Sequence, residues 1–224
     1  MIVEPTLRTE SELCRAGSAL VIGVDEVGRG AIAGPVAVGM VVLDAALVRL
    51  GRRRMPVGLR DSKLLAELRR EQLDPLCRAW AVRHAVGLAS ATEVDEFGII
   101  AALGLAGARA LRQLEEGNGA AFQDAVLLLD GNHDYLSAAA PGCPTVTTRV
   151  KADQTCGSVA AASVIAKVHR DRMMIERDAV MPGYGWARNK GYASPEHLAA
   201  LGRLGISEFH RRTWIGEERL RASA

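Results

Sequence analysis

Residues 19–43 read ALVIGVDEVGRGAIAGPVAVGMVVL, and this stretch decides the fold. Two apolar runs, residues 19–24 and 35–43, flank a glycine-rich turn and are rich in valine, a pattern typical of two strands of one sheet. The first run ends in Asp25 and Glu26, which places two acids at the carboxyl end of a strand. We therefore expect a sheet whose first strand leads directly into a polar site.

The rest of the chain alternates strand and helix patterns. Apolar, strand-like runs return three times, over residues 79–89, 125–129 and 145–150. Amphipathic stretches that predict helices lie between and after them, over residues 62–73, 92–116, 158–178 and 194–205. Thr92 with Asp95 is expected to open the second helix, and Gly117-Asn118-Gly119 to end it.

This order predicts an α/β fold with a mixed β-sheet flanked by helices and a helical C-terminal extension. About half of the residues are apolar (49%), which is enough to bury a full core, and neither a repeat nor a low-complexity linker interrupts the chain. We expect one domain over residues 1–224, with a core at about 19–180 and a helical C-terminal part at about 181–224.

The amino-acid composition excludes few classes of function. A net charge of +2 means that any nucleic-acid affinity must come from local clusters. The four cysteines lie far apart, without the paired short spacing of a structural zinc site, so we expect reduced thiols. Neither a secretory signal nor a membrane span is recognisable, and we expect a cytoplasmic protein.

Acidic residues follow the predicted strands closely. Asp25 and Asp130 each stand at the carboxyl end of an apolar run, where open α/β sheets bind ligands, so we expect them in one cleft. Because side chains alternate along a strand, Glu26 shares that cleft only if the strand already ends there, and the glycines that follow favour such an ending. Asp153, just past the last strand, approaches the same place from the loop before the next helix.

A cluster of these acids would require a cation. Two carboxylates about 4 Å apart repel by roughly 4 kcal/mol at an effective dielectric near 20. Oxygen ligands select hard ions, so we expect Mg²⁺ or Mn²⁺, and a pair of such ions can activate water and stabilise the leaving oxygen in phosphodiester cleavage. Taken singly, however, an aspartate is most commonly a solvated strand end or a cap.

The ribonuclease HII family has a signature segment that resembles Val24-Asp25-Glu26-Val27-Gly28-Arg29-Gly30, followed by Ala33-Gly34-Pro35. Further family motifs follow in the same order: Asp61-Ser62-Lys63, Leu129-Asp130-Gly131-Asn132, Lys151-Ala152-Asp153, Ala161-Ala162-Ser163-Val164-Ile165-Ala166-Lys167-Val168, Pro182-Gly183-Tyr184-Gly185, Asn189-Lys190-Gly191-Tyr192 and His210-Arg211-Arg212. The resemblance spans about residues 20–214.

The resemblance implies an RNase H-like fold with a particular chemistry. Asp25, Glu26, Asp130 and Asp153 would be the metal-binding, catalytic carboxylates, with Mg²⁺ or Mn²⁺ as cofactor. The enzyme would be an endonuclease that hydrolyses the RNA strand of RNA/DNA hybrids and incises at single ribonucleotides embedded in duplex DNA. Hydrolysis with two metal ions would leave 3′-hydroxyl and 5′-phosphate ends. No protein partner is evident, and we expect a monomer.

The family's substrate contacts carry over to six residues: Gly28, Arg29, Gly30, Ser62, Lys63 and Tyr192. Backbone groups of the glycine-rich segment would approach the ribose 2′-OH, the group that distinguishes RNA from DNA. The tyrosine would pack on the sugar at the RNA-to-DNA junction. The lysine, with the serine nearby, would contact backbone phosphate, which positions a duplex without reading its sequence.

The chain departs from the family pattern in a few places. Ala31-Ile32 replaces the usual Pro-Leu, Leu64 replaces a second lysine, and Ala152 stands where glycine is commoner. The segment between Asp130 and Asp153 is longer than usual, which weakens the assignment of Asp153. The sister type, ribonuclease HIII, would show Gly-Lys-Gly and a separate N-terminal domain, so we favour HII.

Two other functions compete with this one. Residues 28–33 fit the loose dinucleotide fingerprint of an oxidoreductase, but that fingerprint must open a helix, whereas residues 35–38 read as strand. The second alternative is a duplex-binding protein that has lost catalysis. The presence of all four acids argues against it, and binding without cleavage would be its mark.

Other polar residues carry weaker expectations. The run Arg52-Arg53-Arg54 is expected to be a solvated loop rather than a phosphate contact. Candidate phosphate contacts lie later in the chain, at Arg170, Arg172, Arg188 and Lys190. His133 and His197 have no partner at metal-ligand spacing, so we expect both on the surface.

Overall fold

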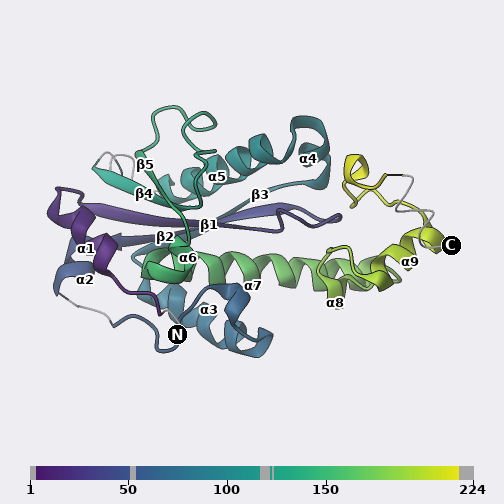
Figure 1. Cartoon of the computed structure of the whole chain (residues 1–224), viewed down its shortest axis with the longest axis horizontal. Helices are drawn as coiled ribbons and strands as arrows, with labels where there is room; N and C mark the ends of the chain where they lie inside the picture. The colour runs from purple at the N-terminus through teal and green to yellow at the C-terminus, as the bar shows by residue number, and fades with distance from the viewer. Residues whose placement is uncertain (1–3, 51–53, 117–121, 123, 217–224) are drawn as a thin grey trace.

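The computed structural model of the chain describes residues 4–50, 54–116, 122 and 124–216 (Figure 1). These residues form a sheet in the order β3-β2-β1-β4-β5. Its strands are β1 (Leu20–Val27), β2 (Val36–Asp44), β3 (Arg83–Ala89), β4 (Ala125–Asp130) and β5 (Thr145–Arg149). The first three pair antiparallel, whereas β1, β4 and β5 run parallel. The expected mixed sheet is therefore confirmed.

Helices cover both faces of this sheet (Figure 1). The long helix α7 (Gly157–Val180) packs on one face, with α3 (Glu67–Trp80) beside it, and α5 (Ile99–Glu115) packs on the other. Shorter elements complete the described chain: α1 (Arg8–Arg15), α2 (Ala45–Leu50), η1 (Ser62–Leu64), α4 (Ala91–Phe97), α6 (Ala152–Thr155), α8 (Trp186–Asn189), α9 (Pro195–Leu204) and η2 (Arg212–Trp214). Of the helices described, none is both long and apolar enough to cross a bilayer.

The alternation of side chains along β1 divides the core in two. Val21 joins the cluster against α7, whereas Ile22 and Val24 join the cluster against α5. At Gly23 the axis of α7 comes so near the strand that an added Cβ would lie 2.3 Å from the backbone carbon of Ser158. A glycine is needed there because only hydrogen fits between the two backbones.

Some predicted boundaries were wrong. The strand expected over residues 79–89 begins only at Arg83, because the first residues of that run end α3. The helix expected over 92–116 is two helices interrupted at Gly98, and its capping box is formed by Ser90 and Glu93 rather than by the predicted pair two residues later. The predicted stop at 117–119 lies outside the described residues.

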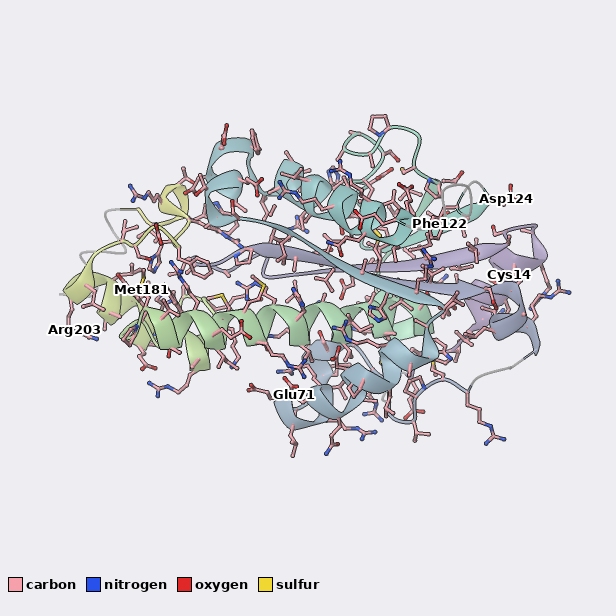
Figure 2. All side chains as sticks on the ribbon, turned by 180° about the vertical axis from the view of Figure 1, so that it is seen from behind. Cys14, Glu71, Phe122, Asp124, Met181 and Arg203 are labelled. Atoms are coloured by element: carbon pink, nitrogen blue, oxygen red, sulfur yellow. The ribbon has the colours of Figure 1, made fainter. Side chains whose placement is uncertain are left out.

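The C-terminal part follows the far end of α7 (Figure 1). Helix α9 begins after Ser194, whose hydroxyl accepts a hydrogen bond from the backbone N–H of His197, as the Ser-Pro signal predicts. Figure 2 shows Met181 and Arg203 at this end and Asp124, at the start of β4, at the opposite end. The molecule is therefore elongated along α7, with the sheet beside the helix.

Candidate active site

Asp25 and Asp130 occupy adjacent parallel strands. The last residue pair of β1 and β4 is Val24 with Leu129, so the next residue of each strand is the aspartate. Asp25 is buried, with 2% of its surface exposed, and Asp130 is half-buried. The two acids meet at the carboxyl ends of the strands, where the sequence predicted them.

Glu26 reaches the site differently from the way predicted. β1 does not end at Glu26; it continues to Val27, because pairing with β2 persists after pairing with β4 has stopped. Asp25 and Glu26 therefore lie on opposite faces of the strand. On the α5 face, the Tyr135 hydroxyl donates to Glu26 Oε2 over 3.5 Å. The predicted early strand end was wrong, and the two acids flank the strand edge instead.

Asp153 is brought to the site by the backbone around it. The residue lies in the first turn of α6, and Asp130 Oδ1 accepts hydrogen bonds from the backbone N–H groups of Ala152 (2.7 Å) and Asp153 (3.3 Å). Lys151 makes this approach possible by adopting a left-handed conformation, with φ of 58°. Hydrogen bonds from the main chain therefore hold Asp153 beside Asp130, despite the long loop between them in the sequence.

Burial and mutual repulsion make these carboxylates costly to ionise. Burial and then Glu26 raise the pKa of Asp25 well above its usual value, and burial raises the pKa of Glu26. Burial, followed by repulsion from Asp130 and Asp61, raises the pKa of Asp153 to about 6. A bound cation would relieve this repulsion.

The carboxylate oxygens of the four acids suit a hard divalent ion, although the side chains do not surround a single metal position. Asp153 Oδ1 is buried and has no hydrogen-bond partner, so one ligand atom is unoccupied by other contacts. All four acids supply oxygen only, as Mg²⁺ and Mn²⁺ prefer. As the side chains stand, however, the described residues include no three His, Cys, Asp or Glu groups placed to hold one ion together.

A cation close to the acids is the ammonium of Lys63. It lies 3.4 Å from Asp153 Oδ2, and although burial opposes its charge, Asp25, Asp61 and Asp153 raise its pKa. Ser62, in contrast, is buried, and its hydroxyl accepts a 2.7 Å hydrogen bond from Ser163. Of the two predicted phosphate contacts, Lys63 is thus exposed and Ser62 is held inside the protein.

Of the other predicted substrate residues, Gly28 is buried, whereas Arg29, Gly30 and Tyr192 are exposed. Arg29 and Gly30 are exposed in the turn after the strand, and Arg29 Nη1 lies 3.5 Å from Glu26 Oε1. Gly28 has φ of 81°, a conformation that favours glycine. Tyr192 is 37% exposed, and its ring lies 5.6 Å from the guanidinium of Arg170.

Several residues predicted to lie at the surface or to contact phosphate are buried. Arg170 and His197 are fully buried, so the first is not a phosphate contact and the second is not a surface residue. Lys190 is also buried, and its ammonium lies 3.2 Å from Glu67. Arg172 and Arg188 are exposed as expected. Of the triple-arginine run, residues 52 and 53 lie outside the described residues.

Sequence reasoning missed three site residues: Tyr135, Asp61 and Ser163. Tyr135 is deeply buried, and burial followed by Glu26 raises its pKa well above its usual value. Asp61 caps η1 by accepting a hydrogen bond from the Lys63 backbone. No periodicity marks these residues, but Asp61 and Ser163 belong to the motifs quoted above, which was the one signal available.

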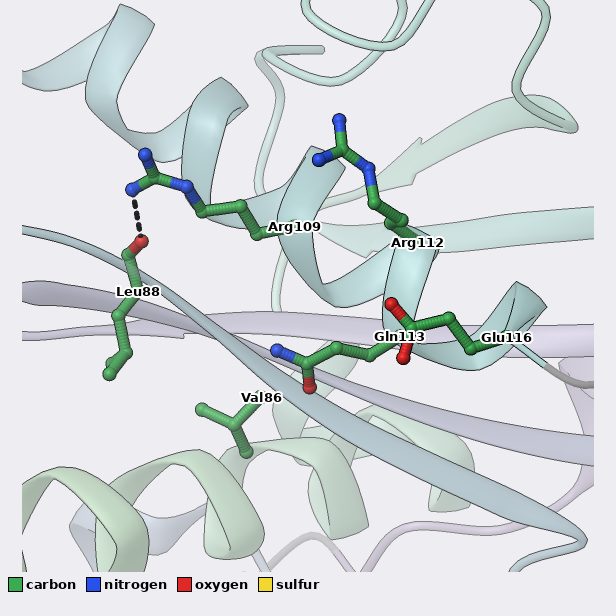
Figure 3. A pocket seen from close by; sticks show the side chains of 6 residues that line it. All are labelled: Val86, Leu88, Arg109, Arg112, Gln113 and Glu116. Atoms are coloured by element: carbon green, nitrogen blue, oxygen red, sulfur yellow. Dashed lines mark hydrogen bonds between the residues drawn. The ribbon is translucent and has the colours of Figure 1, made fainter.

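A hollow of about 320 Å³ lies elsewhere, between the edge strand β3 and α5 (Figure 3). Arg109 from α5 donates to the carbonyl of Leu88, which blocks part of the exposed strand edge. None of the predicted acids lines this hollow.

The comparisons with known proteins identify the family of this chain. The family model described as Ribonuclease HII matches residues 22–216, which include all four acids. The chain belongs to the ribonuclease HII family. Ribonuclease HII from Streptomyces griseus is 47% identical over 220 residues, covering 96% of this chain and 86% of that protein. The chain is therefore a ribonuclease H endonuclease, a nucleic-acid hydrolase of a divalent-metal-dependent family.

Solved structures place the chain among the ribonuclease H2 and H3 folds. Ribonuclease HII of Archaeoglobus fulgidus, solved as a complex with PCNA, is 27% identical with a TM-score of 0.65, covering 87% of this chain and 93% of that chain. Bst-RNase HIII, solved in complex with Mn²⁺, has a TM-score of 0.68 at 20% identity, covering 94% of this chain and 71% of that one. The second likeness concerns the fold alone.

Proposed function

We propose that this protein hydrolyses the RNA strand of RNA/DNA hybrids and incises duplex DNA at single embedded ribonucleotides, leaving 3′-hydroxyl and 5′-phosphate ends. The observation that carries the proposal is the junction of Asp130 with Asp153. One carboxylate oxygen of Asp130 accepts the N–H groups of the α6 turn, while the buried Oδ1 of Asp153 remains without a partner. Such an oxygen is available to a cation.

The carboxylates that would hold two Mg²⁺ or Mn²⁺ ions are Asp25, Glu26, Asp130 and Asp153. When bound, these ions would activate the attacking water and stabilise the leaving oxygen. The protein's own part is to hold the acids in place: β1 and β4 fix Asp25 beside Asp130, and the α6 turn fixes Asp153. The raised pKa values of Asp25 and Glu26 support a cation here, since neutral carboxyl groups are the alternative.

The residues at the surface beside the acids support recognition of the ribose. The backbone of Gly28, Arg29 and Gly30 would contact the 2′-OH, and Tyr192 would pack on the neighbouring sugar. Arg29, Gly30 and Tyr192 are exposed, and Gly28 lies buried just before them. Lys63, exposed next to Asp153, would contact a phosphate near the cut.

The test is cleavage of labelled duplex DNA carrying one ribonucleotide, with and without Mg²⁺ or Mn²⁺, beside an all-DNA duplex and a long RNA/DNA hybrid. We expect metal-dependent incision on the 5′ side of the ribonucleotide and no cutting of the all-DNA duplex. Asp130→Asn should lose activity on the order of 10²-fold or more while keeping its fold, because an amide oxygen can still accept the Ala152 N–H. Asp124→Asn, at the opposite end of the sheet, is the matched control.

The other outcomes are informative. Cutting of long hybrids alone would contradict incision at single ribonucleotides. Tight duplex binding without any cleavage would contradict catalysis and favour a duplex-binding protein.

A further inference from the structure

Two fully buried arginines lie beneath the exposed turn that follows β1. Arg170 comes from α7 and Arg211 from the segment before η2, and neither side chain has any exposed surface. A buried charge ordinarily needs a counter-charge or a full set of hydrogen bonds. Among the described residues, the hydrogen-bond partners of both guanidinium groups are backbone carbonyls.

Arg211 holds the carbonyls of the turn itself. Its Nη2 donates to Gly28 O over 2.7 Å, its Nη1 donates to Arg29 O over 2.9 Å, and its Nε and Nη2 donate to Gly34 O over 3.2 and 3.1 Å. Two successive carbonyls, at Gly28 and Arg29, therefore point inward at one guanidinium.

Arg170 holds the segments on either side of this turn. It donates to Ala33 O (3.1 Å) and Pro35 O (2.8 Å) just before β2, and to Lys190 O (2.8 Å) two residues before Tyr192. The two arginines thus join the turn and the tyrosine segment, which are far apart in the sequence.

Because the carbonyls of this turn point inward, the N–H groups of the same peptide planes point to the outer surface. The peptide bonds are trans, so each N–H points opposite to the carbonyl of the same peptide plane. With Gly28 O and Arg29 O fixed inward, the N–H groups of Arg29 and Gly30 face outward. Neither N–H has an acceptor among the described residues, and a Cβ at Gly30 would meet no atom within 4 Å.

We propose that Arg211 is a positioning residue for ribose recognition: it fixes the carbonyls of Gly28 and Arg29 inward, so that two adjacent N–H groups are presented to the 2′-OH of the substrate. This inference rests on the proposed function and names the residue that orients the recognising groups. Arg211 itself, being buried, does not touch the substrate.

Arginine is required for this role because of its shape. Its planar fork carries five donors and can serve three carbonyls at once, whereas lysine offers three donors from one nitrogen atom. Arg211→Lys keeps the charge and most of the volume but cannot hold Gly28 O, Arg29 O and Gly34 O together. Gly28 O would keep the hydrogen bond from the backbone N–H of Ala31 (3.2 Å), whereas Arg29 O would lose the donor that holds it, so the two N–H groups would lose part of their fixed direction.

The experiment compares binding of two duplexes that differ only in one 2′-OH. Fluorescence anisotropy in Ca²⁺, chosen to limit cutting, would give the affinity ratio between a duplex with one ribonucleotide and the all-DNA duplex. Arg211→Lys should lower that ratio about tenfold, the value of one or two lost hydrogen bonds, with little change for all-DNA. Arg212→Lys, whose side chain is exposed next in the chain, should leave the ratio unchanged.

The results distinguish a failure of the proposed function from a failure of the role proposed for Arg211. If the unmodified protein does not prefer the ribonucleotide duplex, the proposed function fails. If it does and a folded Arg211→Lys retains the same preference, only the role of Arg211 fails.

Hydrogen exchange of the unmodified protein gives a second test that does not depend on the stability of a variant. The amides of Arg29 and Gly30 should exchange rapidly in the free protein and become protected by the ribonucleotide duplex more than by all-DNA. Slow exchange in the free protein would mean that these groups are turned inward, which would overturn the inference.

Discussion

Asp130 combines two roles at the scale of a single residue. Its Oδ1 holds the α6 turn through the N–H groups of Ala152 and Asp153, and its negative charge adds to burial in raising the pKa of Asp153. The same carboxylate therefore brings the last acid close and makes its ionisation unfavourable. A site of this kind is stable only with a cation or with a proton in its place.

Removing one acid should stabilise the metal-free protein. The pKa of Asp153 is raised from 3.8 to about 6, so the folded protein keeps a proton that the unfolded chain has lost, and stability falls as pH rises through this window. At neutral pH, Asp153→Asn should therefore raise the Tm by about 2–4 °C, equivalent to about 1 kcal/mol.

The same variant should lose most of the Tm increase that Mg²⁺ gives the unmodified protein. Thermal melts with EDTA and with Mg²⁺ measure both effects, and Asp124→Asn is the control. A lower Tm in EDTA would contradict the repulsion described here.

Lys63 should act on affinity rather than on sugar selection. Its side chain is 66% exposed beside Asp153, and a phosphate contact carries no information about the sugar. Lys63→Gln should weaken binding of ribonucleotide and all-DNA duplexes by the same factor and reduce the salt dependence of binding by about one ion. Anisotropy titrations over a range of salt concentrations measure this. Arg8→Gln, an exposed charge on α1, should not change the slope.

At the scale of elements, the site depends on how closely α7 approaches β1. Asp25 continues the strand that contains Gly23, and α7 supplies Ser163 beside the acids. The contact between Gly23 and the backbone of Ser158 sets the distance between helix and strand. The position of the helix is therefore fixed by a residue without a side chain.

Gly23→Ala should be severely destabilising. The added methyl group would meet backbone rather than a flexible side chain, so α7 must shift, at a cost of about 1–3 kcal/mol or more. Urea unfolding would measure the loss. Gly216→Ala, where a Cβ would meet nothing, should remain within about 0.5 kcal/mol of the unmodified protein. Equal stability of the two variants would show that the helix can move freely.

At the scale of the whole molecule, a buried histidine pair supports the tyrosine segment. The backbone N–H of Ser207 donates to His210 Nδ1 and the indole N–H of Trp186 donates to His197 Nε2, so both of these nitrogens are acceptors. His210 Nε2 then donates to His197 Nε2 over 3.1 Å, and His197 Nδ1 donates to Tyr192 O over 2.9 Å. Each ring is neutral in this network.

Acid should therefore destabilise the C-terminal part. Burial, and then His197, lower the pKa of His210 to about 4 from 6.5. Between these values the unfolded chain binds a proton that the folded protein does not, so stability falls as pH drops from about 6.5 to 4. His210→Gln should show a smaller loss of stability over this range, measured by urea unfolding at several pH values. An equal pH dependence in both proteins would contradict the assignment.

The sequence by itself determined most of the strands and helices, the candidate acids and the family. Continuous apolar runs predict β1 and β4, and the strand ends predict that Asp25 and Asp130 are neighbours, because parallel strands end at the same edge of a sheet. The signature residues predicted the ribonuclease HII family. That the chain forms one domain stays a prediction, as do the assigned roles of the individual acids.

Only the tertiary structure decided which groups those residues meet. It put Glu26 on the face opposite Asp25, attached Asp153 to Asp130, and buried Arg170, Arg211 and His197, two of which the sequence had placed at the surface. The physical reason is distance along the chain. Arg211 and Gly28 are 183 residues apart, and a hydrogen bond between them arises from packing of the completed fold, which no local pattern of hydrophobicity encodes.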